Sequence, residues 1–214
     1  MWVVKFGGSL YDADSLKNWL ALFANHSSLV VVPGGGPFAD QVRQAQTQFG
    51  FDDSTAHAMA LHAMEQYGRM LCGLQPGLIP AADTEAIYRT LERGDTPVWM
   101  PLTMVLSDGT IEQNWQVTSD SLAAWLAGQL GIDKLVLIKS VRLEREKLTS
   151  DWLQTNQVVD PQFVDYVRRY NPQTWLLGRT DHQDLDRLLR GEMGELSSRV
   201  IKFNLAAATG DEMS

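Results

Sequence analysis

The chain has 214 residues, of which 44% are hydrophobic and 21% are charged, a composition typical of a globular protein and not of a disordered or fibrous one. Its formal net charge is −8, from 18 basic and 26 acidic residues. A chain this acidic lacks the basic surface that nucleic-acid binding requires, so we expect no nucleic-acid partner.

Membrane, disulfide and metal features are not expected either. No apolar run approaches the roughly 18 residues of a membrane helix, and the apolar start of the chain is too short for a signal peptide. Cys72 is the only cysteine, so no internal disulfide can form. His57 and His62 are five positions apart and do not share a helix face as zinc ligands would. We therefore expect a soluble, cytoplasmic protein without a metal site of its own.

The first part of the chain alternates short apolar strands with amphipathic helices. Residues 2–6 form a predicted strand that stops at two glycines, and residues 14–24 carry apolar side chains at helical spacing. Residues 29–32 are apolar without interruption, as buried parallel strands are. That strand ends in three glycines, after which Pro37 suits the first turn of a helix that reaches residue 49.

The alternation continues to the end of the chain. A long helix is predicted over residues 54–74, and a shorter one opens at Asp83 or Thr84 and ends at Gly94. Further strands are predicted at 98–100, 135–138, 174–177 and 199–203, further helices at 119–130, 160–170 and 184–190, and a turn at 107–110. The pattern predicts an α/β fold, a three-layer α-β-α sandwich with a mainly parallel central sheet, as a single domain over residues 1–205 with a loose tail over 206–214.

Two predicted strands end directly in glycine clusters, at residues 7–8 and 34–36. Glycine lets backbone N–H groups approach an anion closely, and both clusters belong to the same edge of a parallel sheet. The two loops can therefore hold a chain of phosphates, with Lys5 beside them as a point charge. Two alternatives remain open. The glycines only make tight turns, or residues 34–39 bind a dinucleotide, although no acidic residue follows at the end of a next strand.

Asp120 lies in the first turn of the predicted helix over residues 119–130. A carboxylate in that position commonly complements the helix dipole, which is worth under about 1 kcal/mol. In the functional interpretation, Asp120 instead holds the lysine of the phosphate site in place. The position alone does not decide between these roles.

Taken in order, these three elements resemble the amino-acid kinase family, which includes acetylglutamate kinase, aspartokinase, uridylate kinase and isopentenyl phosphate kinase. The family pattern is K-x-G-G-S near the N-terminus, G-G-G after the second strand, and N/S-x-D-x-x-A at a helix start before a buried strand. Residues 5–9, 34–36 and 118–123 match this pattern in order and spacing.

The resemblance implies a kinase that uses ATP with Mg²⁺. Lys5 would stabilise the transferring phosphoryl group and Asp120 would position Lys5. The loop that supplies a second catalytic lysine in acetylglutamate kinase has no match, so Lys139, which ends a predicted strand, is preferred to Lys147 as the substitute. The residues implied to bind the nucleotide phosphates are Gly7, Gly8, Ser9, Gly34, Gly35 and Gly36.

Three segments are similar to a small aspartokinase-like branch of the family, which includes a kinase that converts an aminomethyl-furanmethyl phosphate to the diphosphate in methanofuran biosynthesis. These segments are residues 33–40, 56–68 and 115–121. The similarity implies that a small phosphomonoester is the acceptor and that Asp40, His57, Gln116 and Thr118 bind it. Gln116 stands where the branch usually carries Asp.

Two other functions remain possible from the sequence: a kinase that phosphorylates a carboxylate, and a non-catalytic relative that binds nucleotides or oxyanions. The resemblance also implies a homodimer or a higher homo-oligomer. The long helix over residues 54–74 is a candidate contact surface, although its apolar side chains can equally belong to the core.

Overall fold

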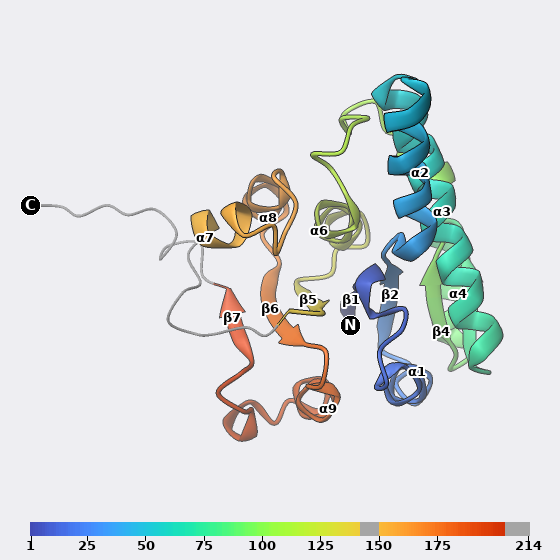
Figure 1. The fold of residues 1–214 in the computed structure, drawn as a ribbon. Coiled ribbons are helices and arrows are strands. Elements are labelled where there is room, and N and C mark those ends of the chain that lie inside the picture. Colours follow the sequence, from blue (N-terminus) through green and yellow to red (C-terminus); the bar gives the residue numbers. More distant parts are fainter. Residues whose placement is uncertain (142–149, 204–214) are drawn as a thin grey trace, which may run out of the picture.

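The computed structural model describes residues 1–141 and 150–203, which form a seven-stranded sheet between two layers of helices (Figure 1). The strand order is β3-β4-β2-β1-β5-β6-β7. All neighbouring strands are parallel except β6 and β7, which are antiparallel. The strands are β1 (Trp2–Phe6), β2 (Leu29–Pro33), β3 (Leu78–Ala81), β4 (Thr96–Trp99), β5 (Lys134–Lys139), β6 (Gln173–Gly178) and β7 (Ile201–Phe203).

Helices cover both faces of this sheet, which confirms the predicted three-layer α/β fold. On one face, α6 and α8 pack with α4, and on the other α1 and α9 pack with the second half of α3. The α-helices are α1 (Leu16–Ala24), α2 (Gly36–Phe49), α3 (Asp53–Leu74), α4 (Thr84–Glu92), α5 (Leu102–Ser107), α6 (Ser119–Gln129), α7 (Ser150–Thr155), α8 (Phe163–Tyr170) and α9 (His182–Arg190), with short 3₁₀ turns η1 (Gly8–Leu10) and η3 (Met193–Glu195). None of the described helices has the length and hydropathy needed to cross a membrane.

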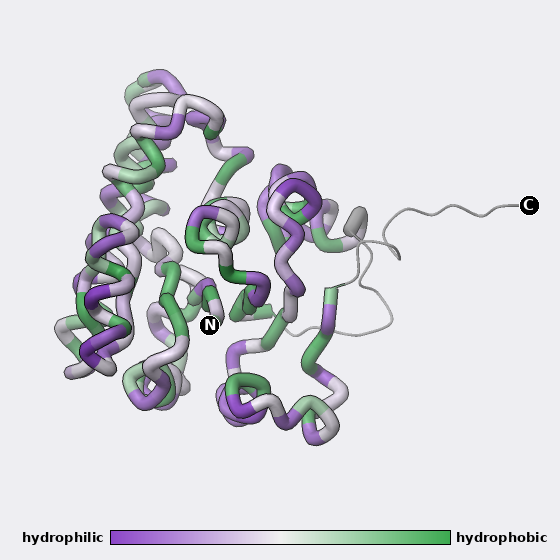
Figure 2. Tube along the Cα trace, turned by 180° about the vertical axis from the view of Figure 1, so that it is seen from behind, coloured by the Kyte–Doolittle hydropathy of each residue, from purple (hydrophilic) through white to green (hydrophobic). Residues whose placement is uncertain are grey.

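The central strands feed two separate cores. In β1, Val3 belongs to the core under α6, whereas Val4 and Phe6 belong to the core under α1, because successive strand residues point to opposite faces. All residues of β1 and β2 are buried, and all of them except Lys5 are apolar. Figure 2 shows hydrophobic residues along the central strands, while the outer helices mix hydrophobic and hydrophilic turns.

Three elements were not predicted from the sequence. Strand β3 lies at the sheet edge and contains Pro80, a residue that is tolerated at an edge but interrupts the usual strand pattern. Helices α5 and α7 have six residues each, which is too short for a helical period to stand out. The predicted helix over residues 160–170 begins at Phe163. The whole of the predicted tail, with residues 204–205 before it, lies outside the described residues.

Helix α3 spends its apolar residues mainly inside the molecule. Leu61 and Met64 join one core, and Tyr67 and Leu71 join the other. Its exposed large hydrophobic residues are Met59 and Leu74. The helix is therefore chiefly intramolecular core, and the homodimer stays a prediction.

The two glycine loops touch each other at the carboxyl edge of the sheet. A Cβ on Gly34 would lie 2.4 Å from the Gly8 nitrogen, and a Cβ on Gly8 would lie 2.2 Å from the Gly36 nitrogen. Both distances are far below contact, and the obstructing atoms are backbone. Glycine is thus required at these positions for the two loops to pack together, whatever else the loops bind.

Replacement of Gly34 by Ala should therefore destabilise the protein by about 1–3 kcal/mol, the usual cost of overpacking. Gly73→Ala is the matched control, because Gly73 lies within α3 and nothing lies within 4 Å of its added Cβ. The control should be neutral or more stable by up to about 1 kcal/mol, the helix propensity difference. Urea unfolding measures both, and equal stabilities of the two variants would contradict the packing argument.

Candidate active site

The side chains of Lys5, Asp120 and Lys139 meet at the carboxyl edge of the sheet. Lys5 Nζ lies 2.8 Å from Asp120 Oδ1, and Lys139 Nζ lies 2.6 Å from Asp120 Oδ2. The three residues are only 5%, 4% and 8% exposed, respectively. We call this group the lysine–aspartate triad.

The register of the sheet brings the two lysines together. Lys5 on β1 pairs with Leu137 on the neighbouring strand β5, so their side chains point to the same face. Lys139 follows Leu137 by two residues in the same strand and shares that face. Helix α6 packs on this face, and its first turn presents Asp120 between the two ammonium groups.

The triad contains two cations and one anion, so it carries an excess positive charge inside the protein. Although burial alone would raise the pKa of Asp120, Lys139 and Lys5 lower it well below its usual range. Burial lowers the pKa of Lys139 to about 8, with a further contribution from Lys5, while Asp120 opposes the shift. A buried excess of positive charge favours an anionic ligand.

The glycine loops add free N–H donors at the same edge. The N–H groups of Gly7 and Gly34 are used within the sheet edge, by Ile138 and Phe6 carbonyls at 3.1 and 2.9 Å. In contrast, the N–H groups of Gly8, Ser9, Gly35 and Gly36 donate to no backbone carbonyl of the described residues. Gly36 also begins α2 with φ of 54°, which favours glycine. The loops therefore form a cradle suited to phosphate oxygens.

A cavity of about 460 Å³ opens between the glycine loops, helices α2 and α3, and the start of α6. We call it the main pocket. Gly8, Gly35 and Gly36 form part of its wall, as does Ser119, the neighbour of Asp120 in the chain. Its charged side chains are Asp12, Asp40 and Arg43.

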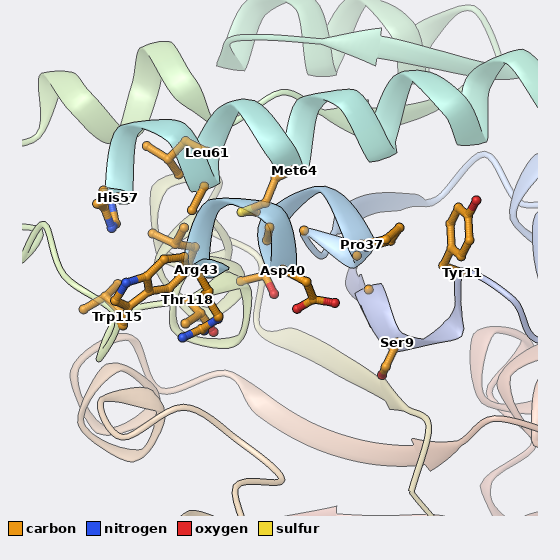
Figure 3. A pocket seen from close by; sticks show the side chains of 18 of the residues that line it. Ser9, Tyr11, Pro37, Asp40, Arg43, His57, Leu61, Met64, Trp115 and Thr118 are labelled. Atoms are coloured by element: carbon orange, nitrogen blue, oxygen red, sulfur yellow. The ribbon is translucent and has the colours of Figure 1, made fainter. Parts of the chain in front are cut away.

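The main pocket has two chemically different ends. Figure 3 shows His57, Arg43 and Trp115 at one end and Ser9 and Tyr11 at the other. The Arg43 guanidinium lies 3.7 Å from the centre of the Trp115 ring, a cation–π contact. The indole Nε1 of Trp115 in turn donates to Gln46 Oε1 at 2.6 Å. This chain of contacts orients Arg43 beside the pocket.

His57 contributes a buried acceptor to the same end. Its Nδ1 lies 3.3 Å from the carbonyl oxygen of Asn114, which can only accept, so Nδ1 carries the proton. Burial lowers the pKa of His57, which leaves the ring neutral at pH 7 and Nε2 with a free lone pair. That atom is buried and has no hydrogen-bond partner among the described residues.

The predicted site residues do not all converge. Asp40, His57 and Thr118 line the main pocket, but Gln116 is exposed and is not part of its wall. Its neighbour Trp115 lines the pocket instead, a role that the sequence pattern did not predict. Lys147, the alternative second lysine, lies outside the described residues.

Ser9 has a different partner from the one that the resemblance implied. Its hydroxyl donates to Ser140 Oγ at 2.8 Å and so joins η1 to the residue that follows β5. The phosphate-binding role implied for Ser9 therefore stays a prediction for its N–H group. The N–H groups of Gly7 and Gly34, in contrast, already donate to carbonyl oxygens of neighbouring strands.

Asp160 is a buried residue of this region that sequence reasoning missed. The sequence places it at the start of the predicted helix over residues 160–170, whereas its carboxylate accepts hydrogen bonds from the start of α6. The distance in sequence between Asp160 and α6 hides this contact. No local pattern in the sequence indicates that this acid meets the start of a helix about forty residues earlier.

A second cavity of about 350 Å³ lies where β5 and β6 end. Its wall includes Ser140, Gly178 and two arginines, Arg179 and Arg199. Arg199 Nε lies 3.3 Å from Asp181 Oδ1, and Asp181 Oδ2 accepts from the Gly178 N–H at 2.8 Å. Within residues 1–141 and 150–203, no three metal-binding side chains come together.

The triad predicts an asymmetry between its members. Asp120→Asn leaves two buried lysines without the carboxylate that pairs with both of them and should cost about 3–5 kcal/mol of unfolding free energy. Lys139→Met, which keeps a similar volume, leaves a neutral Lys5–Asp120 pair and should cost clearly less. Urea unfolding at pH 7 compares them, and an equal or larger loss for Lys139→Met would contradict the excess-charge description.

Comparison with known proteins identifies a family whose model covers the glycine loops and the lysine–aspartate triad. The model of the amino acid kinase family matches residues 1–142. A curated relative from Methanocaldococcus jannaschii, a (5-(aminomethyl)furan-3-yl)methyl phosphate kinase, is 32% identical over 145 residues. The match covers 66% of this chain and 66% of the relative, so about a third of each protein lies outside it.

Solved structures share the fold over nearly the whole chain. The uridylate kinase of Archaeoglobus fulgidus aligns with a TM-score of 0.67 over 89% of this chain and 95% of its own, at 16% identity. The UMP kinase of Ureaplasma parvum aligns with a TM-score of 0.67 over 93% of this chain and 96% of its own, at 13% identity. Identities this low show a common fold. Because the family model covers the glycine loops, Lys5, Asp120 and Lys139, the chain belongs to the amino acid kinase family.

Proposed function

We propose that this chain transfers the γ-phosphoryl group of ATP to a small phosphomonoester and so forms a diphosphate. The observation that carries the proposal is the buried lysine–aspartate triad at the same sheet edge as two glycine loops with unpaired N–H groups. Phosphoryl transfer is catalysed mainly by positioning and electrostatic stabilisation. Cations and N–H donors are therefore the groups that the reaction needs.

In this proposal, Lys5 and Lys139 stabilise the charge on the oxygens of the transferring group. Asp120 holds both lysines and cancels only one of their charges. An oxygen of the acceptor phosphate forms a bond to the γ-phosphorus, the bond to the β–γ bridging oxygen breaks, and ADP leaves. Because the attacking oxygen is already anionic, no residue has to remove a proton.

The second cavity suits the nucleotide. It lies beside Ser140, the residue after Lys139, and its two arginines can contact an anionic ligand. Mg²⁺ bound to the nucleotide would neutralise phosphate charge. In this proposal the nucleotide phosphates would hold that ion.

The charges in the main pocket favour an acceptor that bears both a phosphate and an amine. Arg43 and the glycine N–H groups suit phosphate oxygens, whereas Asp12 and Asp40 would repel a purely anionic ligand and attract an ammonium group. The Methanocaldococcus jannaschii relative is named for a substrate with both groups. We therefore propose an aminomethyl-furanmethyl phosphate as the acceptor.

The buried Nε2 of His57 supports the same substrate chemistry. A neutral imidazole whose Nδ1 is donating can only accept at Nε2, so it needs a donor from the ligand or from water. An ammonium group offers such a donor. A carboxylate-phosphorylating activity is the second candidate, because amino acids also combine an anion with an amine.

Lys5→Ala should lower kcat by about 10²–10³-fold, as the loss of one preorganised donor to developing charge does. Lys139→Ala should lower kcat by a similar factor. Lys17→Ala is the matched control, since Lys17 is exposed on α1. ADP release coupled to acceptor phosphorylation measures the effect, and turnover near that of wild type in either active-site variant would contradict the assigned role.

Asp40→Asn should raise KM for an amine-bearing phosphomonoester by about tenfold, equal to about 1.4 kcal/mol of lost attraction. It should leave KM for the same acceptor without its amine nearly unchanged. Asp14→Asn, an exposed acid outside the pocket wall, is the control.

The same assay should include aspartate and acetylglutamate as acceptors. Turnover of these carboxylates, with every phosphomonoester inert, would overturn the proposed acceptor and leave the kinase assignment intact. Nucleotide binding without ADP release on any acceptor would instead favour a binding protein.

A further inference from the structure

We infer that Asp160 is a positioning residue of the proposed phosphoryl transfer: it clamps the first turn of α6 and thereby holds the Asp120 carboxylate between Lys5 and Lys139. The inference rests on the proposed function for its catalytic consequence. Its structural part stands on contacts that are independent of the reaction.

The contacts of Asp160 define the start of α6. Asp160 Oδ2 accepts from the N–H and the hydroxyl of Thr118 at 3.0 and 2.8 Å, and from the N–H of Ser121 at 3.0 Å. Its Oδ1 accepts from the Ser121 hydroxyl. Thr118 is the N-cap residue of α6 but caps it with no side-chain bond of its own. A carboxylate from a distant segment therefore supplies the cap that the helix would otherwise lack.

Asp120 lies between the two clamped residues. Thr118 and Ser121 flank it in the chain, so any movement of this turn moves the Asp120 carboxylate relative to both lysines. Asp160 is itself only 7% exposed. The clamp thus transmits its position to the triad through one helical turn.

The protonation of Asp160 follows from its partners. Burial and the nearby Asp120 raise its pKa, whereas the hydrogen bonds donated by Ser121 and Thr118 oppose this shift. Donors of this kind match an ionised carboxylate, because a protonated acid would have to give up one acceptor position. The clamp that we infer uses this ionised form, which places a second buried anion near the triad.

That anion also acts on Lys139. Among the described residues, the charged groups that influence Lys139 are Asp120 from α6, Lys5 from β1 and Asp160. The residue beside it on β6 is Gly178, which carries no charge. Asp160 opposes the effect of burial and favours the charged form of Lys139. Asp160 thus influences Lys139 in two ways, directly through its charge and indirectly by holding Asp120 in place.

Two variants separate the clamp from the charge. Asp160→Asn keeps an oxygen for the N–H groups but removes the charge, so the alkaline limb of kcat/KM that reports Lys139 should move to lower pH by about one unit. The sign follows because a less stable ammonium loses its proton at lower pH. Asp160→Ala removes the clamp as well and should lower kcat by about 10²-fold, with a smaller change in KM for ATP. Asp160→Glu should recover part of the activity.

Asp184→Asn is the matched control. Asp184 is another buried acid that accepts from a main-chain N–H and a hydroxyl, both of Ser197, but it lies in α9 away from the triad. This variant should lose stability without moving the pH profile. If neither Asp160→Asn nor Asp160→Ala moved the profile more than Asp184→Asn, the inference would be overturned.

A readout without turnover keeps the inference separate from the proposed function. The ¹³C resonance of the Lys139 Cε, identified by its loss in Lys139→Met, reports the titration of that lysine in the free protein. It should titrate at lower pH in Asp160→Asn than in wild type and be unchanged in Asp184→Asn. An unchanged titration would refute the inference even if the kinase were active, whereas a shifted titration without any kinase activity would refute only the proposed function.

Discussion

The ion pairing of Asp120 with two buried lysines is the interaction on which the rest of the site depends. Parallel pairing of β1 with β5 gives Lys5 and Lys139 the same face, and α6 covers that face with its first turn. Without the carboxylate, two ammonium groups would share a low-dielectric interior, which is costly. With it, the group keeps one excess positive charge. The protein thus accepts a modest electrostatic cost that an anionic ligand can offset.

The glycine loops complete this arrangement through packing. Backbone contact between the loops requires glycine at Gly8 and Gly34. The N–H groups of Gly8 and Gly36 have no backbone partner within residues 1–141 and 150–203. Structural and functional explanations of these glycines are therefore not alternatives. The close approach that excludes a side chain is also what gathers unpaired donors beside the lysine–aspartate triad.

Selectivity in the proposed reaction would come from the charged and polar side chains in the wall of the main pocket. The Trp115 ring contacts the Arg43 guanidinium and its Nε1 donates to Gln46. These contacts orient the long Arg43 side chain, so that its positive charge has a defined place in the pocket wall. Asp12, Asp40 and the free lone pair of His57 favour donors. A pocket with both kinds of group discriminates between ligands by the placement of their charges and not by net charge alone.

The sequence by itself determined the α/β fold and the position of Lys5, the glycine loops and Asp120, because each lies at the end of a strongly patterned strand or helix. It also favoured Lys139, since a residue that ends a buried strand reaches the ligand edge. Tertiary structure decided the rest. Strand β3 depends on β4 for its hydrogen bonds, Trp115 and not Gln116 faces the pocket, and Asp160 caps a helix about forty residues earlier in the chain. These contacts join segments that are distant in sequence, and no local periodicity or propensity encodes which distant segments will meet.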